Sequence, residues 1–426
     1  MDCLQRGTMG GLIVLAIVVG LGGAVGAALF HLIIYVSTNL FYGPGAAGNF
    51  IGTISALSLP LRILIPTLGG LLVGVIYKYA KVTEAEGEGV PEVMEALAHH
   101  RGNIRPIVAP VKIITAAITL GSGGSAGREG PVIQIGSAIG SSVGQWLKLD
   151  TEKRSLLLAA GAAAGIGGTF GAPIAGLLFT TEILGHKLTL TKTLVIAIAS
   201  LVGTFGAQAL TGGAGLRFLI SNNTSVTFTL VITLVCIGML SAFVAIGFGS
   251  VLTKARAAFQ SLSFPHLLKP ALGGLIIGMV GLYLPYIHEP AAYPLTIDLI
   301  QIVSIPLFFL VALFIVKIFA TAITLGSGGS GGIFAPLLLT GALLGSLLSQ
   351  ILLSLEMIDI STATTIVVVG MAAVFAAAAH APLTAAFILV EMTENIMLLP
   401  LLLGVCYLAV FVAKNIKKDS VYQIQE

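Results

Sequence analysis

Two glutamates lie beside glycine-rich breaks in an otherwise apolar chain. Glu129 lies in GSGGSAGREGP (121–131) and Glu88 lies in GEGVPE (87–92). Because proline is favoured in the first turn of a helix, each stretch predicts a helix start whose unpaired N–H groups and dipole favour an anion. An ionised Glu129 could take the place of that anion and leave it on protonation. The pattern predicts an anion site gated by Glu129; the alternative is a structural salt bridge between Arg128 and Glu129.

The glycine-rich break that contains Glu129 occurs twice in the sequence. VKIITAAITLGSGGSAGREGP (111–131) returns 205 positions later as VKIFATAITLGSGGSGGIFAP (316–336). In the second copy Ile333 and Phe334 replace the charged pair, so the helix start is kept and the titratable group is lost. Three such starts that converge would hold an anion without a full positive charge, which leaves the ion free to depart.

The composition indicates the surroundings of these breaks. Of the 426 residues, 56% are hydrophobic and 9% are charged, whereas soluble domains carry roughly 25% charged residues. Apolar runs long enough for bilayer-crossing helices recur along the chain, without the alternating segments of a β-barrel. We therefore predict an all-α polytopic membrane protein. The three cysteines have no metal or disulfide spacing and the basic clusters are small, so no metal, cofactor or nucleic acid is expected.

The duplication extends beyond the breaks. Segment 161–182 is echoed by 370–391, which predicts a first repeat over 1–212, a linker over 213–225 and a second repeat over 226–426. Such repeats are typical of transporters whose site lies at the repeat interface and is built by discontinuous helices. Several runs are short or broken by glycine, which favours an inverted arrangement of the two repeats.

The remaining charged residues are interpreted as having structural roles or as indicating the membrane topology. Lys112 and Lys317 are duplicated, and Glu182 and Glu391 end apolar helices, so we expect structural roles for all four. By the positive-inside rule, the polar segments rich in lysine and arginine are cytoplasmic, including the C-terminus. The residues of those segments are Arg101, Arg105, Lys254, Arg256, Lys269, Lys414, Lys417 and Lys418.

The motifs GEGVPE, GREGP and GGIFAP, together with SVYQIQ near the end, resemble the CLC family of chloride channels and chloride/proton exchangers. The resemblance covers about residues 10–426. It implies an inverted-repeat fold, a homodimer with one pore per subunit, and chloride/proton antiport with Glu129 as the external gating and proton-transfer glutamate. It also implies anion-binding residues: Glu88, Gly89, Arg128, Glu129, Gly130, Ile333, Phe334 and Tyr422. The chain leaves no room after 426 for a cytoplasmic nucleotide-binding pair, so a prokaryotic plasma membrane is expected.

Two departures from the family pattern keep the mechanism open. Ile183 stands where many exchangers have an inner proton-delivering glutamate, which keeps a passive gated chloride channel as an alternative. Glu88 stands where the family typically has an anion-binding serine, so it either swings into the cytoplasmic vestibule or is a candidate inner proton site. A fluoride exchanger departs at the same serine but generally lacks the terminal tyrosine, so Tyr422 favours chloride.

An enzyme is the remote alternative. GGSAG (123–127) and GGSGG (328–332) both fit G-x-S-x-G and, with His380, would suggest an intramembrane serine hydrolase. That motif requires a strand–turn–helix context. Here it follows from glycine and serine richness in both copies, and the chain is not expected to be an enzyme.

Overall fold

The protein is an all-helical chain. The computed structural model describes residues 9–187, 189–213, 218, 227–288, 293–300 and 305–423. The α-helices are α2 (Met9–Tyr42), α3 (Phe50–Ala56), α4 (Leu59–Ala80), α5 (Val90–Ala98), α6 (Val108–Gly121), α7 (Glu129–Trp146), α8 (Thr151–Phe170), α9 (Pro173–Glu182), α10 (Leu190–Thr211), α11 (Phe228–Ser261), α12 (Lys269–Gly281), α13 (Tyr293–Ile300), α14 (Leu307–Gly326), α15 (Phe334–Ser354), α16 (Ile360–Ala379), α17 (Pro382–Thr393) and α18 (Leu399–Ile416). The short 3-10 helices are η1 (Thr83–Ala85), η2 (His266–Leu268), η3 (Pro285–His288) and η5 (Ile396–Leu398).

Eight of the described helices are long and apolar enough to cross a membrane: α2, α4, α10, α11, α14, α15, α16 and α18 with η5. Helices α6, α12 with η2, and α17 are apolar but shorter, as expected for segments that end inside the protein. Backbone that is not helical is tolerated at membrane depth only where protein or a wet cavity surrounds it. The prediction of a polytopic helical membrane protein is confirmed.

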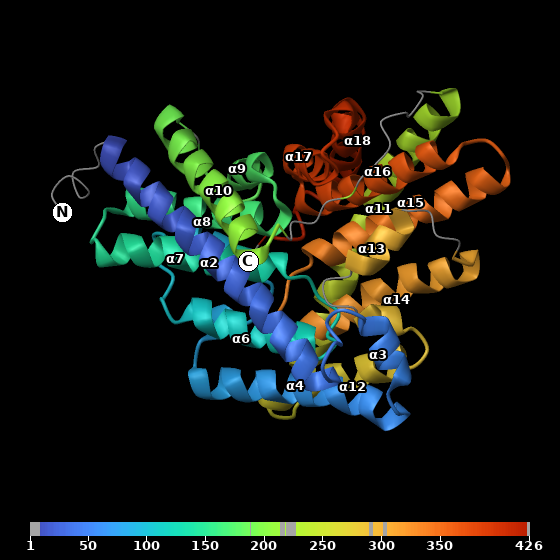
Figure 1. The fold of residues 1–426 in the computed structure, drawn as a ribbon, viewed down its shortest axis with the longest axis horizontal. Coiled ribbons are helices and arrows are strands. Elements are labelled where there is room, and N and C mark those ends of the chain that lie inside the picture. The colour runs from blue at the N-terminus through green and yellow to red at the C-terminus, as the bar shows by residue number, and fades with distance from the viewer. Residues whose placement is uncertain are drawn as a thin grey trace.

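The two copies of the break lie side by side. The Gly127 N–H donates to the Gly332 carbonyl and the Gly332 N–H donates to the Gly127 carbonyl, both at 2.7 Å, in an antiparallel bridge. A reciprocal contact between equivalent positions is what a pseudo-two-fold axis produces. In Figure 1 most helices of the first half (α2 and α6 to α10) lie on the left and most helices of the second half (α11 and α13 to α18) on the right, while α3, α4 and α12 lie together at the bottom.

The repeats are inverted relative to a cavity of about 980 Å³, which we call the vestibule. Thr83, just after the end of α4, lines the vestibule, and Lys269, the first residue of the equivalent helix α12, lines it too. Helices α4 and α12 pack against each other (Figure 1) through reciprocal close contacts of Gly70 with Pro270 and of Gly274 with Pro66. Helix α4 of the first repeat therefore ends at the vestibule, whereas the equivalent helix α12 of the second repeat begins there. This opposite direction confirms the inverted arrangement.

Glycine lets equivalent helix pairs approach closely. A methyl group on Gly136 of α7 would clash with the carbonyl of Gly161 on α8, and one on Gly341 of α15 would clash with the carbonyl of Gly370 on α16. Small residues at such crossings are the usual means by which helices pack in membranes. These contacts fix the directions of α7 and α15, and hence the point at which the two helices begin.

Two glutamates join the repeats, in agreement with their predicted structural roles. The Glu391 carboxylate at the end of α17 accepts the amides of Ile174 and Ala175 at the start of α9, both at 2.9 Å. In return Glu182, at the end of α9, accepts the amide and the hydroxyl of Thr384 near the start of α17, at 2.6 and 2.7 Å. Most of the predicted linker 213–225 lies outside the described residues.

Candidate functional site

Glu129 begins α7, and its side chain turns toward the start of α15. The side chain is only 1% exposed, and Oε2 accepts the Ala335 amide at 3.2 Å. The same oxygen lies 2.5 Å from where a methyl group on Gly127 would sit, so glycine is needed for this approach. The carboxylate thus occupies a position where the positive end of α15 favours negative charge.

Arg128 is a weaker partner for Glu129 than the backbone is. Its Nε lies 3.9 Å from Glu129 Oε1, while Nη1 lies 3.0 Å from Nδ1 of His31 on α2. The guanidinium therefore extends toward α2 rather than covering the carboxylate. The ion pair weighed from the sequence exists at long range, beside the contact to Ala335.

Three helix starts meet at Gly130, as the motifs predicted. A methyl group on Gly130 would clash with the Glu88 carbonyl of the break before α5 and would lie 3.0 Å from Gly332 Cα in the break before α15. The first N–H groups of a helix have no acceptor within it. The starts of α7 and α15 therefore bring backbone donors at Gly130, Ile333 and Phe334 to one place.

The third helix start is capped by its own first turn. The Gly89 amide donates to Glu92 Oε2 at 2.7 Å. Gly89 also has φ +98°, a conformation that favours glycine. The role of Gly89 as an anion donor stays a prediction; in this arrangement an internal carboxylate, that of Glu92, uses its N–H group. The sequence contained the signal, since a glutamate three residues after a helix cap is typical of a capping box.

Glu88 is buried against an arginine of the second repeat. Its side chain is 1% exposed, and Oε1 accepts a hydrogen bond from the Arg256 guanidinium of α11. Among the described residues Oε2 has no hydrogen-bond partner. Burial raises the pKa of the Glu88 carboxyl to about 7, against the opposing charge of Arg256. Glu88 thus does not extend freely into the vestibule, because Arg256 stands between them.

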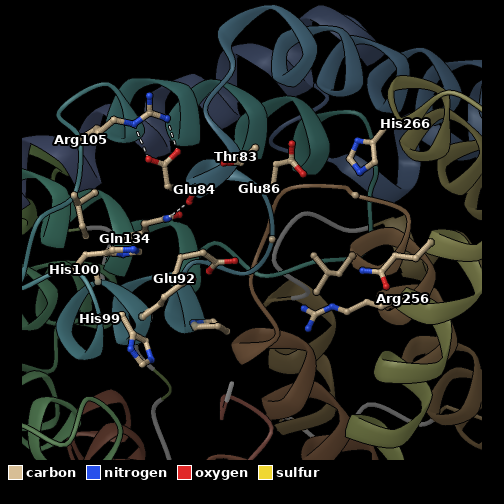
Figure 2. Close-up of a pocket in the computed structure, with 18 of the residues that line it drawn as sticks. Thr83, Glu84, Glu86, Glu92, His99, His100, Arg105, Gln134, Arg256 and His266 are labelled. Carbon is tan, nitrogen blue, oxygen red and sulfur yellow. Dashed lines mark hydrogen bonds and ion pairs between the residues drawn. The ribbon is translucent and has the colours of Figure 1, made fainter. Parts of the chain in front are cut away.

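Sequence reasoning missed the role of Arg256, which it counted only among basic residues that indicate topology. A carboxylate inside an apolar chain demands a counter-charge. The partner lies 168 positions away, however, and no local pattern joins the two. Arg256 lines the vestibule with its side chain 39% exposed (Figure 2), so it contacts both the cavity and the buried carboxylate.

Tyr422 lies close enough to both carboxylates to interact with their charges. The residue is 1% exposed, and its hydroxyl has no hydrogen-bond partner within the described part of the chain. The neighbouring Val421 amide donates to the Ala378 carbonyl at 2.9 Å, which fixes this segment against α16. Burial, then the charge of Glu88, then that of Glu129 raise the pKa of the Tyr422 hydroxyl. An unpartnered hydroxyl at this point is available to a bound anion.

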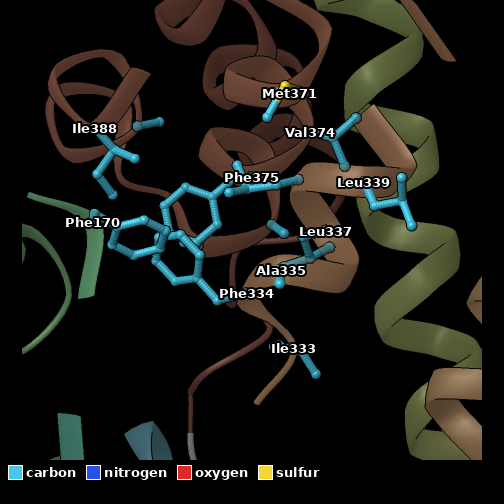
Figure 3. Packing of buried hydrophobic residues seen from close by; sticks show 14 of the residues in the cluster. Phe170, Ile333, Phe334, Ala335, Leu337, Leu339, Met371, Val374, Phe375 and Ile388 are labelled. Atoms are coloured by element: carbon cyan, nitrogen blue, oxygen red, sulfur yellow. The ribbon is translucent and has the colours of Figure 1, made fainter. Parts of the chain in front are cut away.

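The wall beside the start of α15 is aromatic. The Phe334 ring lies 3.9 Å from the Phe375 ring and 5.0 Å from the Phe170 ring, measured between centroids (Figure 3). Ile333 and Phe334 are both buried, so their side chains belong to the core and the backbone is the part of each that faces the helix start. Such apolar walls strengthen electrostatic interactions at the site.

The vestibule carries charges of both signs. Lys112, behind its wall, donates to the carbonyls of Ala85 and Gly87 at 3.2 and 2.8 Å and so holds the loop before Glu88. This is the structural role expected for Lys112. The titratable residues that line the cavity (Figure 2) are Glu84, Glu86, Glu92, Glu95, His99, His100, Arg101, Arg105, Arg256, His266 and Lys269.

The serines of the two G-x-S-x-G stretches hold the breaks together. The Ser125 amide donates to Thr324 Oγ1 and the Ser330 amide donates to Thr119 Oγ1, each at 3.1 Å. The Ser125 hydroxyl lies 3.2 Å from the Thr321 hydroxyl. The hydroxyl contact of Ser125 is thus to a threonine of the other repeat, which supports a structural role and not that of a nucleophile.

Together these features define a polytopic helical membrane protein of two inverted repeats, in which broken helices surround two buried carboxylates. Residues 69–414 match the family described as voltage gated chloride channel. The chain belongs to this family, the CLC family, and is of the prokaryotic type.

Relatives and solved structures cover most of the chain. It is 32% identical over 395 residues to a ClcB-like chloride channel protein of Ralstonia nicotianae, which covers 89% of this chain and 88% of the relative. It is 31% identical over 376 residues to the H(+)/Cl(-) exchange transporter ClcA of Vibrio parahaemolyticus (85% and 79%). A slow cyanobacterial Cl-/H+ antiporter superposes with a TM-score of 0.85 at 26% identity, with 96% of each chain covered. A CLC-type fluoride/proton antiporter shares the fold, with a TM-score of 0.80 at 22% identity and the same coverage.

Proposed function

We propose that this protein exchanges chloride for protons across a membrane, with Glu129 as the outer gate and proton-transfer group. The observation that carries the proposal is the Glu129 carboxylate on the Ala335 amide, at the start of α15. The similarity to a relative named as an H(+)/Cl(-) exchange transporter and to a solved Cl-/H+ antiporter supports it.

The exchange follows from competition for the helix start. Ionised Glu129 holds the Ala335 amide and excludes chloride. Protonation removes its charge, so the positive end of α15 then favours a chloride ion, and the side chain leaves. Chloride contacts the backbone of Gly130, Ile333 and Phe334. Each arriving chloride thus displaces a side chain that must first take up a proton, which couples the two flows.

The inner part of the proton route differs from that of a glutamate-bearing exchanger. Ile183 is buried and cannot titrate. Glu88 is the nearest candidate inner proton site, because it is buried and reaches the vestibule through Arg256. The apolar side chain of Ile183 is the reason to keep an alternative, a passive gated chloride channel in which Glu129 opens the path without net proton movement.

The vestibule faces the cytoplasm in this proposal. Arg101, Arg105, Arg256 and Lys269 all line it, and positive residues are enriched on the cytoplasmic side. We place the protein in the inner membrane of a prokaryote with its C-terminus on the same side. A homodimer with one path per subunit, and repeats that divide near 213–225, complete the proposal. Cross-linking in native membranes tests the dimer.

Reversal potentials in proteoliposomes separate the two functions. Under crossed chloride and pH gradients, an exchanger shifts its reversal potential with the pH gradient, whereas a channel follows the chloride gradient alone. We expect the shift. Purely chloride-determined potentials would select the channel, and vesicles that pass no chloride would refute both.

A further inference from the structure

Glu88 and Arg256 form an ion pair at the boundary between the vestibule and the buried site. The Arg256 guanidinium lines the cavity, while the Glu88 carboxylate that it contacts is almost wholly buried. The charge of Glu88 also acts on Tyr422, whose hydroxyl is unpartnered among the described residues. Glu88 therefore stands between the vestibule and the place where the proposed chloride ion binds.

The backbone around Glu88 is fixed on every side. The carbonyls of Ala85 and Gly87 accept from Lys112, and the Gly89 amide is held by Glu92. The Gly89 backbone also packs directly on Gly130. Any opening at this point must come from rotation of the Glu88 and Arg256 side chains, because the chain that carries Glu88 cannot move without breaking these contacts.

Another small anion can replace the Glu88 carboxylate on the Arg256 guanidinium. A guanidinium binds carboxylates through its N–H groups, and the same groups bind other small anions. A chloride ion that arrives from the vestibule meets Arg256 first, since Arg256 is the partly exposed member of the pair. Chloride and the Glu88 carboxylate must compete for the same donors.

We propose that Glu88 and Arg256 form an inner latch: the Glu88 carboxylate occupies the position on Arg256 that an anion takes on its way from the vestibule to the buried site. This inference rests on the proposed anion transport, and it adds an inner counterpart to the Glu129 gate. It assigns Arg256 as an anion-binding residue and Glu88 as its tethered competitor.

Protonation opens the latch, because a neutral carboxyl holds a guanidinium less strongly and no longer repels an incoming anion. Burial places the Glu88 pKa near neutrality. The charged groups that act on Glu88 are Arg256 from α11, Lys112 from α6 and Glu92 from α5, with the Tyr422 hydroxyl beside it. Arg256 and Lys112 lower its pKa and Glu92 raises it.

A double-mutant cycle on chloride binding tests the latch. Isothermal titration of chloride into detergent-purified protein compares the wild type with Glu88→Gln, Arg256→Gln and the double variant. Glu88→Gln keeps the shape and removes the competing charge, so we expect chloride to bind about tenfold more tightly, as for one hydrogen bond to a charged group. This increase in chloride affinity should vanish when Arg256 is also replaced by glutamine. Part of the increase should return when Arg256 is replaced by lysine instead.

The vestibule offers a matched control. Arg105 and Glu84 form a second arginine–glutamate pair on its wall, exposed rather than buried (Figure 2). Glu84→Gln removes the same charge at a similar location and should leave chloride affinity unchanged. A gain from Glu88→Gln that is equal with and without Arg256, or a similar gain from Glu84→Gln, would refute the latch.

A flux measurement separates the latch from the outer gate. In a Glu129→Ala background the outer carboxylate no longer titrates, so the remaining pH dependence of chloride flux should come from Glu88 and should disappear in Glu129→Ala/Glu88→Gln. Persistence of the same pH profile would overturn the latch alone. Wild-type vesicles without chloride flux would instead overturn the proposed function.

Discussion

The outer and inner carboxylates are equally buried but differ in what compensates their charge. Glu129 rests on a backbone amide, that of Ala335, with Arg128 at long range. Glu88 rests on the full charge of Arg256. An amide at a helix start is fixed in place and carries only partial charge, whereas a guanidinium is mobile and carries a whole one.

In the proposed mechanism, this difference separates two kinds of gate. When Glu129 leaves, the fixed helix start keeps its preference for an anion, so chloride can replace the carboxylate directly. When the Glu88 side chain leaves Arg256, each charge loses its partner. A buried charge without a partner raises the free energy of the protein. The outer site is therefore suited to repeated exchange, and the inner pair to a barrier that opens when Glu88 is neutral.

The largest expected effect comes from removing the outer carboxylate. Glu129→Ala should abolish proton movement and leave chloride flux, because the helix start remains while the titrating competitor is gone. Proton uptake and chloride efflux are measured together in proteoliposomes, with Glu84→Gln as a control that should keep both. Proton pumping that survives in Glu129→Ala would show that the gate has been assigned to the wrong residue.

Other carboxylates at helix starts sharpen this contrast. Glu182 accepts the amides of Leu383 and Thr384 and the Thr384 hydroxyl, at 2.6 to 3.0 Å. The contact of Glu129 with the Ala335 amide is longer, at 3.2 Å. A carboxylate with three short donors is held in place and serves as a clamp between repeats.

Glu182→Gln and Glu391→Gln should accordingly lower stability by about 1–3 kcal/mol each, because charged acceptors of helix-start amides are lost. Thermal unfolding in detergent measures the loss. The ratio of protons to chloride in vesicles should stay at the wild-type value. A changed ratio in Glu182→Gln would place this residue on the proton route and contradict its structural role.

Much of the fold could be predicted because its determinants are local or repeated. Long apolar runs indicated the spanning helices, and the duplicated break at 121–131 and 326–336 indicated two related halves. The meeting of three helix starts followed from glycine and proline at the same positions in each motif. Broken helices in a membrane require these residues, so the residues can be recognised in the sequence without knowledge of contacts between distant positions.

The details of the site depend on contacts that the sequence does not encode locally. The pairing of Glu88 with Arg256 joins two repeats, and its identity depends on where α11 crosses the first half. The placement of Tyr422 near the two carboxylates depends on the Val421 contact to α16. The capping of the Gly89 amide by Glu92 was not predicted for a different reason, because two functions of a helix-start amide, capping and anion binding, share one signature.

The Tyr422 hydroxyl offers a smaller test of the proposed anion site near the two carboxylates. Tyr422→Phe removes a hydroxyl that has no protein partner in the described structure, so the free energy of unfolding should not change. If this hydroxyl binds chloride, affinity should fall about twofold to tenfold, as for one hydrogen bond. Isothermal titration measures the affinity and thermal unfolding measures the stability.

Tyr77 is the matched control for that substitution. Its hydroxyl lies 3.0 Å from the Ala85 carbonyl and 3.2 Å from Thr115 Oγ1, so its partners are within the protein. Tyr77→Phe should therefore lower stability and leave chloride affinity near the wild-type value. The opposite pattern, with stability lost in Tyr422→Phe and affinity unchanged, would mean that Tyr422 only packs.

The last expected effect is a dependence of stability on pH that is specific to the inner carboxylate. The folded protein raises the Glu88 pKa to about 7, against roughly 4.3 in an unfolded chain. Ionised Glu88 therefore destabilises the fold, by an amount that grows as pH rises from about 4.3 and levels off above about 7. The melting temperature of Glu88→Gln should exceed that of the wild type by a margin that widens between about pH 5 and pH 8.

The exposed pair in the same vestibule should behave in the opposite way. Arg105 lowers the pKa of Glu84, so ionised Glu84 stabilises the fold slightly, and this gain is present above its unfolded pKa and lost only in acid. Glu84→Gln should thus show a small, constant loss across the neutral range. A melting-temperature difference that widens with pH for Glu88→Gln and stays constant for Glu84→Gln would distinguish a buried latch from a surface ion pair. The same dependence on pH in both variants would mean that Arg256 compensates the charge of Glu88 fully.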